Sequence, residues 1–434
     1  MNDNINLMRF FFISAFIWAC SVGLVAQEKS LKEQAIEAYK RENYPEAIAL
    51  LEKAATITPD DPEIYYYLGY YSHYNAYDSR PLAGYDEQSS EKIFRYLDKA
   101  LELNPEYGDA KYFYGAQCSG MAFLYMQRNQ AGNLRMIYKK AFDKGAYPGW
   151  LLEFGRNMLN SCDPDAILFA GGNADFDVCM YLQLNENFRK DITVIPIGNI
   201  DRPWYVRFLK NGLPGAVRKI NIYLTNEQIE DIHPYKWDTT TIKIPIPGHL
   251  LNAYSLDKNA VMEWPVLPDL SSERKKQDDP GKKRTFLSPQ RAILLQIVEA
   301  NKWERPICFS NGANNQLMGG LDEYVQQCGL VSKLLPFKTG ETPWQVNVKA
   351  LEKLVKKTDA FKNYPGVLNN NMPRISGITF LYHGSVYLLA HEYYKTGNKE
   401  GIGELEKIYE ACLKTGLNQT TEQMYLDGIR KMKQ

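Results

Sequence analysis

Few features of this sequence would mark a nucleic-acid or membrane surface. Lys and Arg together number 51, as do Asp and Glu, so the formal net charge is zero. A neutral chain has no overall field that would draw it to nucleic acid or to an anionic membrane. The charged run over 268–285 mixes Lys and Arg with Asp and Glu, which is typical of a solvated loop. We therefore expect no nucleic-acid partner.

Signatures of metal, redox and nucleotide chemistry are also missing. No two of the seven cysteines have the C-x-x-C spacing, and His391 lacks the second histidine of an H-E-x-x-H zinc motif. No glycine-rich phosphate-binding pattern is present. We expect no metal and no cofactor. Most of the six cysteines after the N-terminal segment are expected to be buried, and whether any of them form disulfides stays open: Cys118, Cys162, Cys179, Cys308, Cys328 and Cys412.

Long hydrophobic runs are confined to the N-terminus. Arg9 precedes an apolar stretch that ends at Ala26, ahead of a polar segment, which is the pattern of a secretory signal peptide. We expect cleavage near Ala26; a lipoprotein that uses Cys20 is the alternative. No later run reaches the roughly 18 to 20 apolar residues of a spanning helix. The mature chain is therefore expected to be exported, periplasmic or envelope-associated, without a membrane span.

The region 27–150 contains an internal repeat. Small and aromatic residues recur at the spacing of paired helices, and Pro59 and Pro105 each end a pair. These segments resemble tetratricopeptide repeats, with a third copy beginning near Asp109. The two prolines are 46 residues apart, 12 more than the period of about 34 residues, which places an inserted loop in the second copy. Such repeats imply a helical arm with a concave face for a protein or peptide partner.

The region 160–340 has a different periodicity. Short runs rich in Ile and Val predict strands at 166–170, 192–197, 220–224 and 306–310, and helix-like segments separate several of them. This alternation favours a Rossmann-like, mostly parallel α/β domain. Residues 239–254 alternate like an edge or hairpin strand, because their prolines exclude a central position. The overall fold class is therefore α+α/β.

The region 341–434 returns to a helical pattern. Residues 386–416 read as a helix, a Gly-Asn turn and a second helix, which resembles one further tetratricopeptide unit. The two helical regions would thus flank the α/β domain.

Polar turns follow three of the predicted strands. If the strands are parallel, the turns meet beyond their carboxyl ends, where open α/β sheets bind ligands. The candidate ligand-binding residues are Gly171, Gly172, Asn173, Asp175, Asn199, Asp201, Asn311 and Asn314. The same residue types also make tight turns and helix caps. Purely structural turns, a site for a neutral polar ligand such as a sugar, and an anion site therefore remain three alternatives.

Four segments of the central region resemble a known family. They are Gly171–Asp175, Arg202–Tyr205, Trp303–Phe309 and Gly320–Tyr324. These segments are similar to the part that follows the membrane helices in bacterial glycosyltransferase-like proteins akin to protein O-mannosyltransferases. The resemblance covers roughly 160–340 and implies a link to glycans. In that family the catalytic acids lie in the membrane-embedded part, so the resemblance does not imply the activity.

The expected function is that of an exported binding or assembly protein of the cell envelope. Its repeats would hold a protein or peptide, and its central domain would recognise a glycan or a glycosylated protein. The alternative is a carbohydrate-active enzyme that uses carboxylates at the strand ends, with Asp175, Asp201 and Asp322 as candidates. We favour the binding protein over the enzyme. Acids that are engaged in structural bonds would support that choice.

Overall fold

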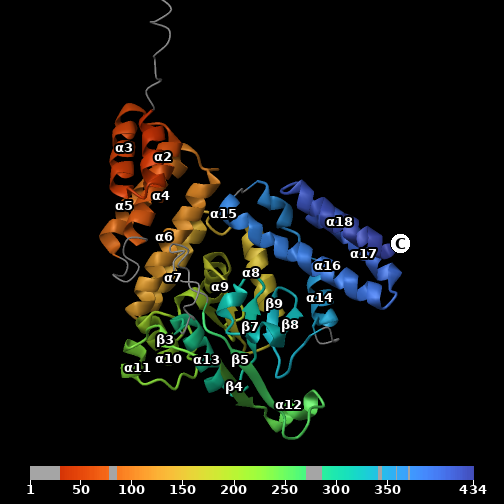
Figure 1. Ribbon diagram of the computed structural model, residues 1–434. Coiled ribbons are helices and arrows are strands. Elements are labelled where there is room, and N and C mark those ends of the chain that lie inside the picture. The colour runs from red at the N-terminus through yellow and green to blue at the C-terminus, as the bar shows by residue number, and fades with distance from the viewer. Residues whose placement is uncertain (1–29, 78–85, 270–285, 341–344, 358, 370–371) are drawn as a thin grey trace, which may run out of the picture.

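The computed structural model describes residues 30–77, 86–269, 286–340, 345–357, 359–369 and 372–434 (Figure 1). The expected signal segment, Cys20 and nearly all of the charged run 268–285 lie outside the described residues. Among the described residues, every helix is too short or too polar to cross a bilayer. The same residues contain no group of three His, Cys, Asp or Glu side chains that could hold a metal ion.

Three helix pairs form an N-terminal repeat arm, seen at the upper left of Figure 1. Small residues let the paired helices approach: Ala35, Ala38 and Ala47 are fully buried, and a Cβ at Gly69 would clash with Leu97. This packing explains the predicted repeat spacing. The arm comprises α2 (Leu31–Lys40), α3 (Tyr44–Ile57), α4 (Pro62–Tyr77), α5 (Glu87–Leu103), α6 (Gly108–Gln127) and α7 (Ala131–Asp143).

A mixed five-stranded sheet lies below the arm, with strand order β2-β1-β7-β9-β8. Strands β1, β2 and β7 are parallel, β9 is antiparallel to β7, and β8 is antiparallel to β9. Residues of β1, β2 and β7 are buried throughout, as their apolar sequences predict. The strands are β1 (Ile167–Ala170), β2 (Thr193–Pro196), β7 (Ile307–Ser310), β8 (Val325–Cys328) and β9 (Val331–Leu334).

The sheet corrects two expectations. Residues 220–224 do not form a strand, because Ile220 donates its backbone N–H to Leu209 of a neighbouring helix, and Ile220 and Ile222 are buried as an extended segment. The sheet is also less parallel than expected, since an antiparallel hairpin completes it. A Rossmann-like domain is therefore not confirmed, although a combination of helical repeats with an α/β centre is.

Helices cover the central sheet. Helix α9 packs against α7 and α8, so the last repeat pair is joined to the sheet through α9. Ser288 is the N-cap residue of α13, with Pro289 in its first turn, and Thr225 forms a capping box with Gln228 at the start of α11. These helices are α8 (Gly149–Ser161), α9 (Asn173–Asn185), α10 (Pro203–Asn211), α11 (Asn226–Glu230), α13 (Pro289–Asn301) and the short 3₁₀ helix η1 (Ile197–Asn199).

Two small antiparallel sheets extend from the centre. The predicted hairpin strand is present as β4 (Thr240–Pro245), which pairs with β5 (Val261–Val266) around α12 (Gly248–Ala253). The other sheet joins β3 (Tyr235–Lys236) to β6 (Phe286–Leu287).

The C-terminal helices from residue 380 onward lie on the far side of the molecule from the repeat arm, whereas residues 373–376 contact α6 of the arm (Figure 1). The predicted helix–turn–helix is present as α16 and α17. All six cysteines named above are unpaired thiols, and five of them are buried. The elements are η2 (Asn315–Leu317), η3 (Leu321–Tyr324), α14 (Val348–Val355), η4 (Tyr364–Val367), α15 (Pro373–Ser376), η5 (Gly377–Thr379), α16 (Phe380–Lys395), α17 (Lys399–Ile408), η6 (Tyr409–Leu413) and α18 (Gln419–Lys433).

Candidate functional site

The three polar turns do meet at one edge of the sheet. Strands β1, β2 and β7 run in the same direction, so the turns 171–175, 198–201 and 311–315 follow their carboxyl ends. We call these three turns the strand rim. The predicted convergence is therefore confirmed, and the chemistry of the rim depends on what its polar groups already bind.

Asp175 is the centre of the first turn. One carboxylate oxygen accepts the backbone N–H of Gly172 at 2.8 Å, and the other accepts the N–H of Gly171 at 2.8 Å. The second oxygen also accepts the hydroxyl of Ser310, at the end of β7, at 2.6 Å. Asp175 thereby caps the N-terminus of α9 and joins two strands, which is a structural use of its charge.

The polar side chains after β7 are also engaged. Asn311 donates its amide N–H to the carbonyl of Gly329 at 2.9 Å and accepts the hydroxyl of Ser332 at 2.9 Å. Asn314 accepts the backbone N–H of Gln316 at 3.0 Å and so caps η2. All three bonds hold the turn, as the structural alternative expects.

The turn after β2 is less fully bonded. Asp201 accepts the side-chain amide of Gln290 at 2.7 Å, while its second oxygen is buried without a hydrogen-bonding partner among the described residues. Burial raises the pKa of Asp201 above its usual value. Asn199 is half-buried, and Asn173 in the first turn is exposed. A ligand-binding role for the eight rim residues stays a prediction.

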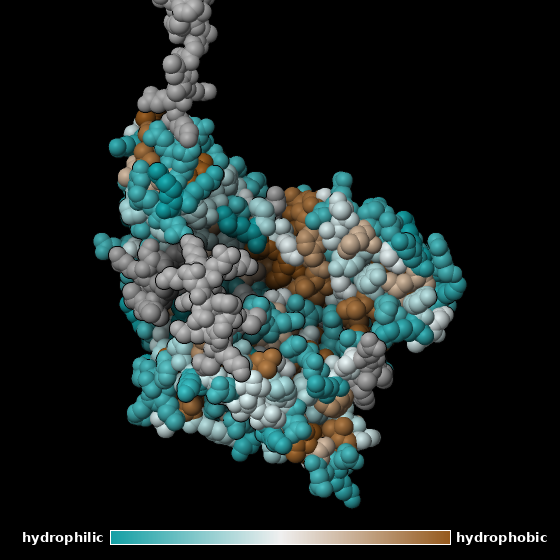
Figure 2. Space-filling model, viewed as in Figure 1, coloured by the Kyte–Doolittle hydropathy of each residue, from teal (hydrophilic) through white to brown (hydrophobic). Residues whose placement is uncertain are grey.

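Other parts of the chain cover much of the rim. A Cβ placed on Gly171 would lie 2.5 Å from the carbonyl oxygen of Gly312, so the turns after β1 and β7 touch. A Cβ on Gly312 would in turn lie 3.8 Å from Leu381 of α16. Figure 2 shows hydrophobic side chains at the bottom of the recess between the repeat arm and the C-terminal helices. The C-terminal region therefore closes over this part of the rim.

A small cavity remains beside the start of α9. Its volume is about 30 Å³, and its lining includes Asn173, Asp177, Tyr147 and Ile375. Space of that size suits a water molecule or two, whereas small-molecule sites measure roughly 300 to 1,000 Å³. The cavity cannot hold a sugar.

Asp177 is the most perturbed carboxyl group near this cavity. It is buried, and its Oδ1 accepts the hydroxyl groups of Ser119 at 2.8 Å and Tyr138 at 3.2 Å. Burial raises the pKa of Asp177 to about 7, and the two hydrogen bonds only partly oppose that effect.

Asp177→Asn tests this burial. The pKa of Asp177 in the folded protein exceeds the ordinary carboxyl value of about 4. The protonated carboxyl therefore contributes its full stability to the wild-type fold below about pH 4. That stability is lost as the pH rises towards and through 7. Asparagine keeps the accepting oxygen and does not titrate. We expect the stability of the variant relative to wild type to rise by about 1.4 kcal/mol per pH unit between pH 4 and 7.

Urea unfolding at several pH values measures this difference. Asp322→Asn is the matched control, because it makes the same substitution at an exposed position. An Asp177→Asn difference that stays constant over the same range would contradict the assignment.

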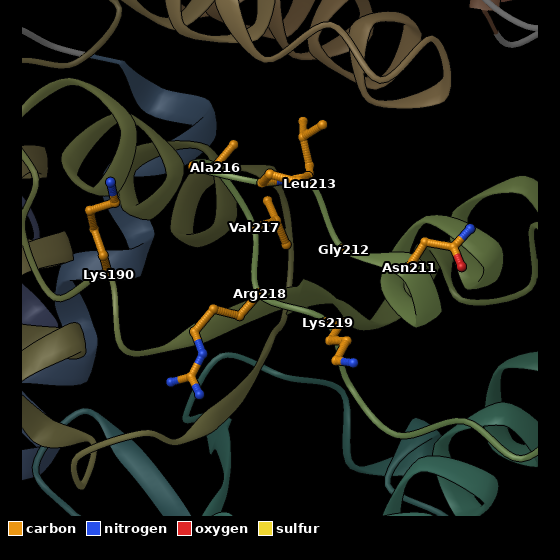
Figure 3. A pocket seen from close by; sticks show the side chains of 10 residues that line it. Lys190, Asn211, Gly212, Leu213, Ala216, Val217, Arg218 and Lys219 are labelled. Carbon is orange, nitrogen blue, oxygen red and sulfur yellow. The ribbon is translucent and has the colours of Figure 1, made fainter.

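A further hollow, of about 300 Å³, lies at the loop that follows α10. Figure 3 shows Arg218 and Lys219 diverging from this loop, with Lys190 across the hollow. Arg218 pairs with Asp165. Much of the lining comes from the loop's own Gly, Pro, Ala and Val residues, so the hollow offers few polar groups to a ligand.

The first helices of the three pairs present aromatic rings to one another. Tyr39 of α2 stacks on Tyr71 of α4 with ring centroids 4.1 Å apart, and its hydroxyl lies 2.8 Å from that of Tyr70. Tyr70 in turn stacks on Phe113 of α6, with centroids 4.3 Å apart. We call this aromatic surface of α2, α4 and α6 the inner face of the repeat arm.

Arg374 of α15 sits on the inner face. Its guanidinium carbon lies 4.7 Å from the ring centroid of Tyr70 and 5.0 Å from that of Phe113. Its Nε is 3.9 Å from the carboxylate of Asp109, which also accepts the hydroxyl of Tyr66 at 3.2 Å. The inner face therefore holds a guanidinium by aromatic and charge contacts. Arg374 carries no local sequence signal, because its partners Phe113 and Tyr70 lie about 260 and 300 residues earlier in the chain.

Two histidines of α16, His383 and His391, do not form a site. His383 is buried, and its two ring nitrogens contact the hydroxyls of Tyr364 at 2.9 Å and Tyr409 at 2.6 Å. Burial lowers the pKa of His383 to about 4, so it is a neutral packing residue at pH 7. His391 is half-exposed on the same helix.

Two families match parts of this chain. The family described as TPR repeat matches residues 37–73, which span the end of α2, all of α3 and most of α4. The family described as TMEM260-associated domain 2 matches 151–262 and 246–353. This second match fits a region related to membrane proteins, while the likeness to protein O-mannosyltransferases stays a prediction. Among curated proteins, none matches the chain. The chain thus contains a tetratricopeptide repeat within residues 37–73 and a central region similar to TMEM260-associated domain 2.

Proposed function

We propose that this protein is an exported binding or assembly component of the cell envelope, whose repeat arm holds a basic segment of a partner protein. The observation that carries the proposal is the guanidinium of Arg374 on the inner face. Arg374 belongs to the chain itself, and its position indicates which kind of side chain this surface accepts. Repeat arms bind extended partners along such surfaces.

The chemistry of the inner face supports an arginine-bearing partner. Tyr70 and Phe113 are buried beneath Arg374, and their ring faces carry the negative charge density that attracts its guanidinium. Asp109 adds a carboxylate at the edge of the same surface. Arg suits this surface better than Lys, because its planar group stacks on rings while it donates hydrogen bonds.

Export and a link to glycans are the finer parts of this proposal. The apolar segment before Ala26 supports export, and the match to TMEM260-associated domain 2 supports a role beside glycosylation-related proteins. We also propose the arm (27–150), the centre (160–340) and the helical tail (341–434) as the units of the chain. At the strand rim, Asn173 and Asn199 are the residues we propose for contact with a neutral polar ligand.

The three carboxylates that the alternative enzyme would need do not form a free pair in the fold. Asp175 accepts three hydrogen bonds from its own fold, and Asp201 accepts one from Gln290. Asp322 is exposed on η3. Acids engaged in this way support the binding protein, because a glycosidase needs a pair of free carboxyl groups that face one substrate.

Peptide titration tests the proposal. We expect a fluorescent decapeptide of alternating Arg and Ser to bind the protein more tightly than its Lys and Glu counterparts. Tyr70→Leu removes a ring beneath the cation, so it should weaken binding by roughly three- to thirtyfold, the equivalent of about 0.5 to 2 kcal/mol. Arg374→Ala should strengthen peptide binding by a similar factor, because it removes the side chain that covers Tyr70 and Phe113.

Tyr70→Phe is the matched control. It keeps the ring and removes only the hydroxyl, which contacts Tyr39 and hydrogen-bonds Arg374. Its peptide affinity should fall less than that of Tyr70→Leu, because the ring beneath the cation remains. Equal binding of the Arg and Glu peptides, or a loss of affinity in Arg374→Ala, would argue against an arginine-binding inner face.

A further inference from the structure

A hollow of about 770 Å³ lies at the opposite edge of the sheet from the strand rim. One wall is the end of α8 and the turn with Asp163 and Pro164, which precedes β1. Asp191, which precedes β2, also lines it, and α14 forms the facing wall. These segments lie at the amino ends of the strands, so this hollow and the rim are separate places. Its volume is that of a small-molecule or oligomer site.

The acidic groups of the hollow are already neutralised. Arg189 binds both carboxylate oxygens of Asp191 at 2.9 Å and donates to the carbonyl of Leu159 at 2.9 Å. Asp163 pairs with Lys333 at 2.5 Å. Neither carboxylate is left to neutralise a further cation in the hollow.

Helix α14 supplies three further cations. Lys349 and Lys353 are one turn apart, about 6 Å along the axis, and Lys357 follows just beyond the end of the helix. All three are exposed and line the hollow. Within the part of the chain that the structure describes, none of the three forms an ion pair, whereas the neighbouring Lys356 pairs with Glu404 at 2.8 Å. Lys357 influences the pKa of Glu153 without pairing with it.

Buried side chains and an N-cap fix the position of α14. Leu351, Leu354 and Val355 are buried, which anchors the helix, and Asn347 caps it by accepting the N–H of Ala350 at 3.1 Å. The lysine row is therefore held along the hollow rather than carried on a loose segment. We call the hollow and this row the lysine groove.

The uncharged residues that line the hollow restrict the class of ligand that it could bind. Asn160 offers an amide group, which suits sugar hydroxyls. Asn157 donates to Ala360 and Tyr382, and Ser161 is bonded to the backbone of Asn157 and Leu330, so these two side chains belong to the fold. None of the described lining residues is aromatic, so a nucleotide base would have no ring on which to stack. An extended peptide could not add to the sheet here, because the outer side of β8 is already bonded to residues 345–347, with Gln327 and Gln345 in contact at 2.9 Å.

We propose that the lysine groove binds an anionic oligosaccharide, with carboxylate or sulfate groups on the lysine row and hydroxyls on the side-chain amide of Asn160. This inference rests on the proposed link to glycans for the class of ligand. It shares no residue with the inner face of the repeat arm. The two sites can therefore be tested and can fail independently.

Isothermal titration of the purified protein with tetragalacturonate, a tetrasaccharide with four carboxylates, tests the proposal. We expect saturable binding that weakens as salt is raised, and no comparable binding of neutral maltotetraose. The triple variant K349Q/K353Q/K357Q should bind tetragalacturonate about tenfold or more weakly. The matched control K258Q/K407Q/K414Q removes the same three charges from exposed sites elsewhere and should change affinity by less than about twofold.

Several results would overturn the proposal. They are absence of saturable binding, an equal loss in the control variant, and binding of tetraglutamate as tight as that of the saccharide, which would assign the groove to an acidic peptide. The Tyr70→Leu variant separates the two sites, because it should keep full affinity for tetragalacturonate. If K349Q/K353Q/K357Q still binds the arginine peptide, the proposal for the repeat arm is supported whatever the outcome for the lysine groove.

Discussion

Asp175→Ala is expected to lower the free energy of unfolding by about 4 kcal/mol, a large part of the 5 to 15 kcal/mol that ordinarily separates folded from unfolded chains. The side chain accepts three hydrogen bonds from Gly171, Gly172 and Ser310 while buried. Its removal leaves these donors unsatisfied beside the start of α9. Asp175→Asn should also destabilise, since both oxygens accept and an amide nitrogen would face a donor.

Urea unfolding measures the global change, and hydrogen–deuterium exchange over 167–185 shows where it arises. Asp322→Ala is the control, because Asp322 is exposed and its loss should cost no more than about 0.5 kcal/mol. If Asp175→Ala unfolded like wild type, while ligand binding at the rim changed, Asp175 would be a ligand contact and not a structural residue.

The convergence of the strand rim was predictable from sequence. The runs 166–170, 192–197 and 306–310 are short, apolar and β-branched, and parallel neighbours must place the following turns at one edge. The role of those turns was not predictable. Asp175 is four residues from Gly171, so a cap is visible in the sequence, but its bond to Ser310 crosses 135 residues. A local pattern therefore cannot distinguish a cap that joins strands from a ligand contact.

The hairpin of β8 and β9 was missed although its signal is present. Only Gly329 and Leu330 separate the two strands, and Gly329 has a φ of 76°. Glycine at the first position of a two-residue turn is the mark of a tight hairpin that needs positive φ. By contrast, the prediction of a strand at 220–224 was wrong because apolar composition alone does not supply a partner strand.

The two proposed binding surfaces also differ in how much of each can be predicted from the sequence. The spacing of Lys349, Lys353 and Lys357 is visible in the sequence as one helix face. What the sequence does not show is the hollow beside it, since that depends on how α8 and α14 pack. Arg374 gives no such local signal, because its partners Tyr70 and Phe113 lie in distant helices.

Gly171→Ala is expected to destabilise the fold by about 3 kcal/mol, near the upper end of overpacking costs. A Cβ at this position would lie 2.5 Å from the carbonyl oxygen of Gly312 and 2.8 Å from the backbone nitrogen of Ala313. Both are backbone atoms, so relief requires the turn after β7 to move as a whole. Thermal unfolding of the variant should therefore begin at a lower temperature than that of wild type.

The adjacent glycine provides an internal control. Gly172 has a φ of −166°, which any residue can adopt, and a Cβ there would meet no atom within 4 Å. Gly172→Ala should therefore change stability by no more than about 0.5 kcal/mol. If both substitutions were tolerated equally, the turns after β1 and β7 would have to be farther apart than the structure places them. The rim would then have room for a ligand between these two turns, which the contact of Gly171 with Gly312 closes here.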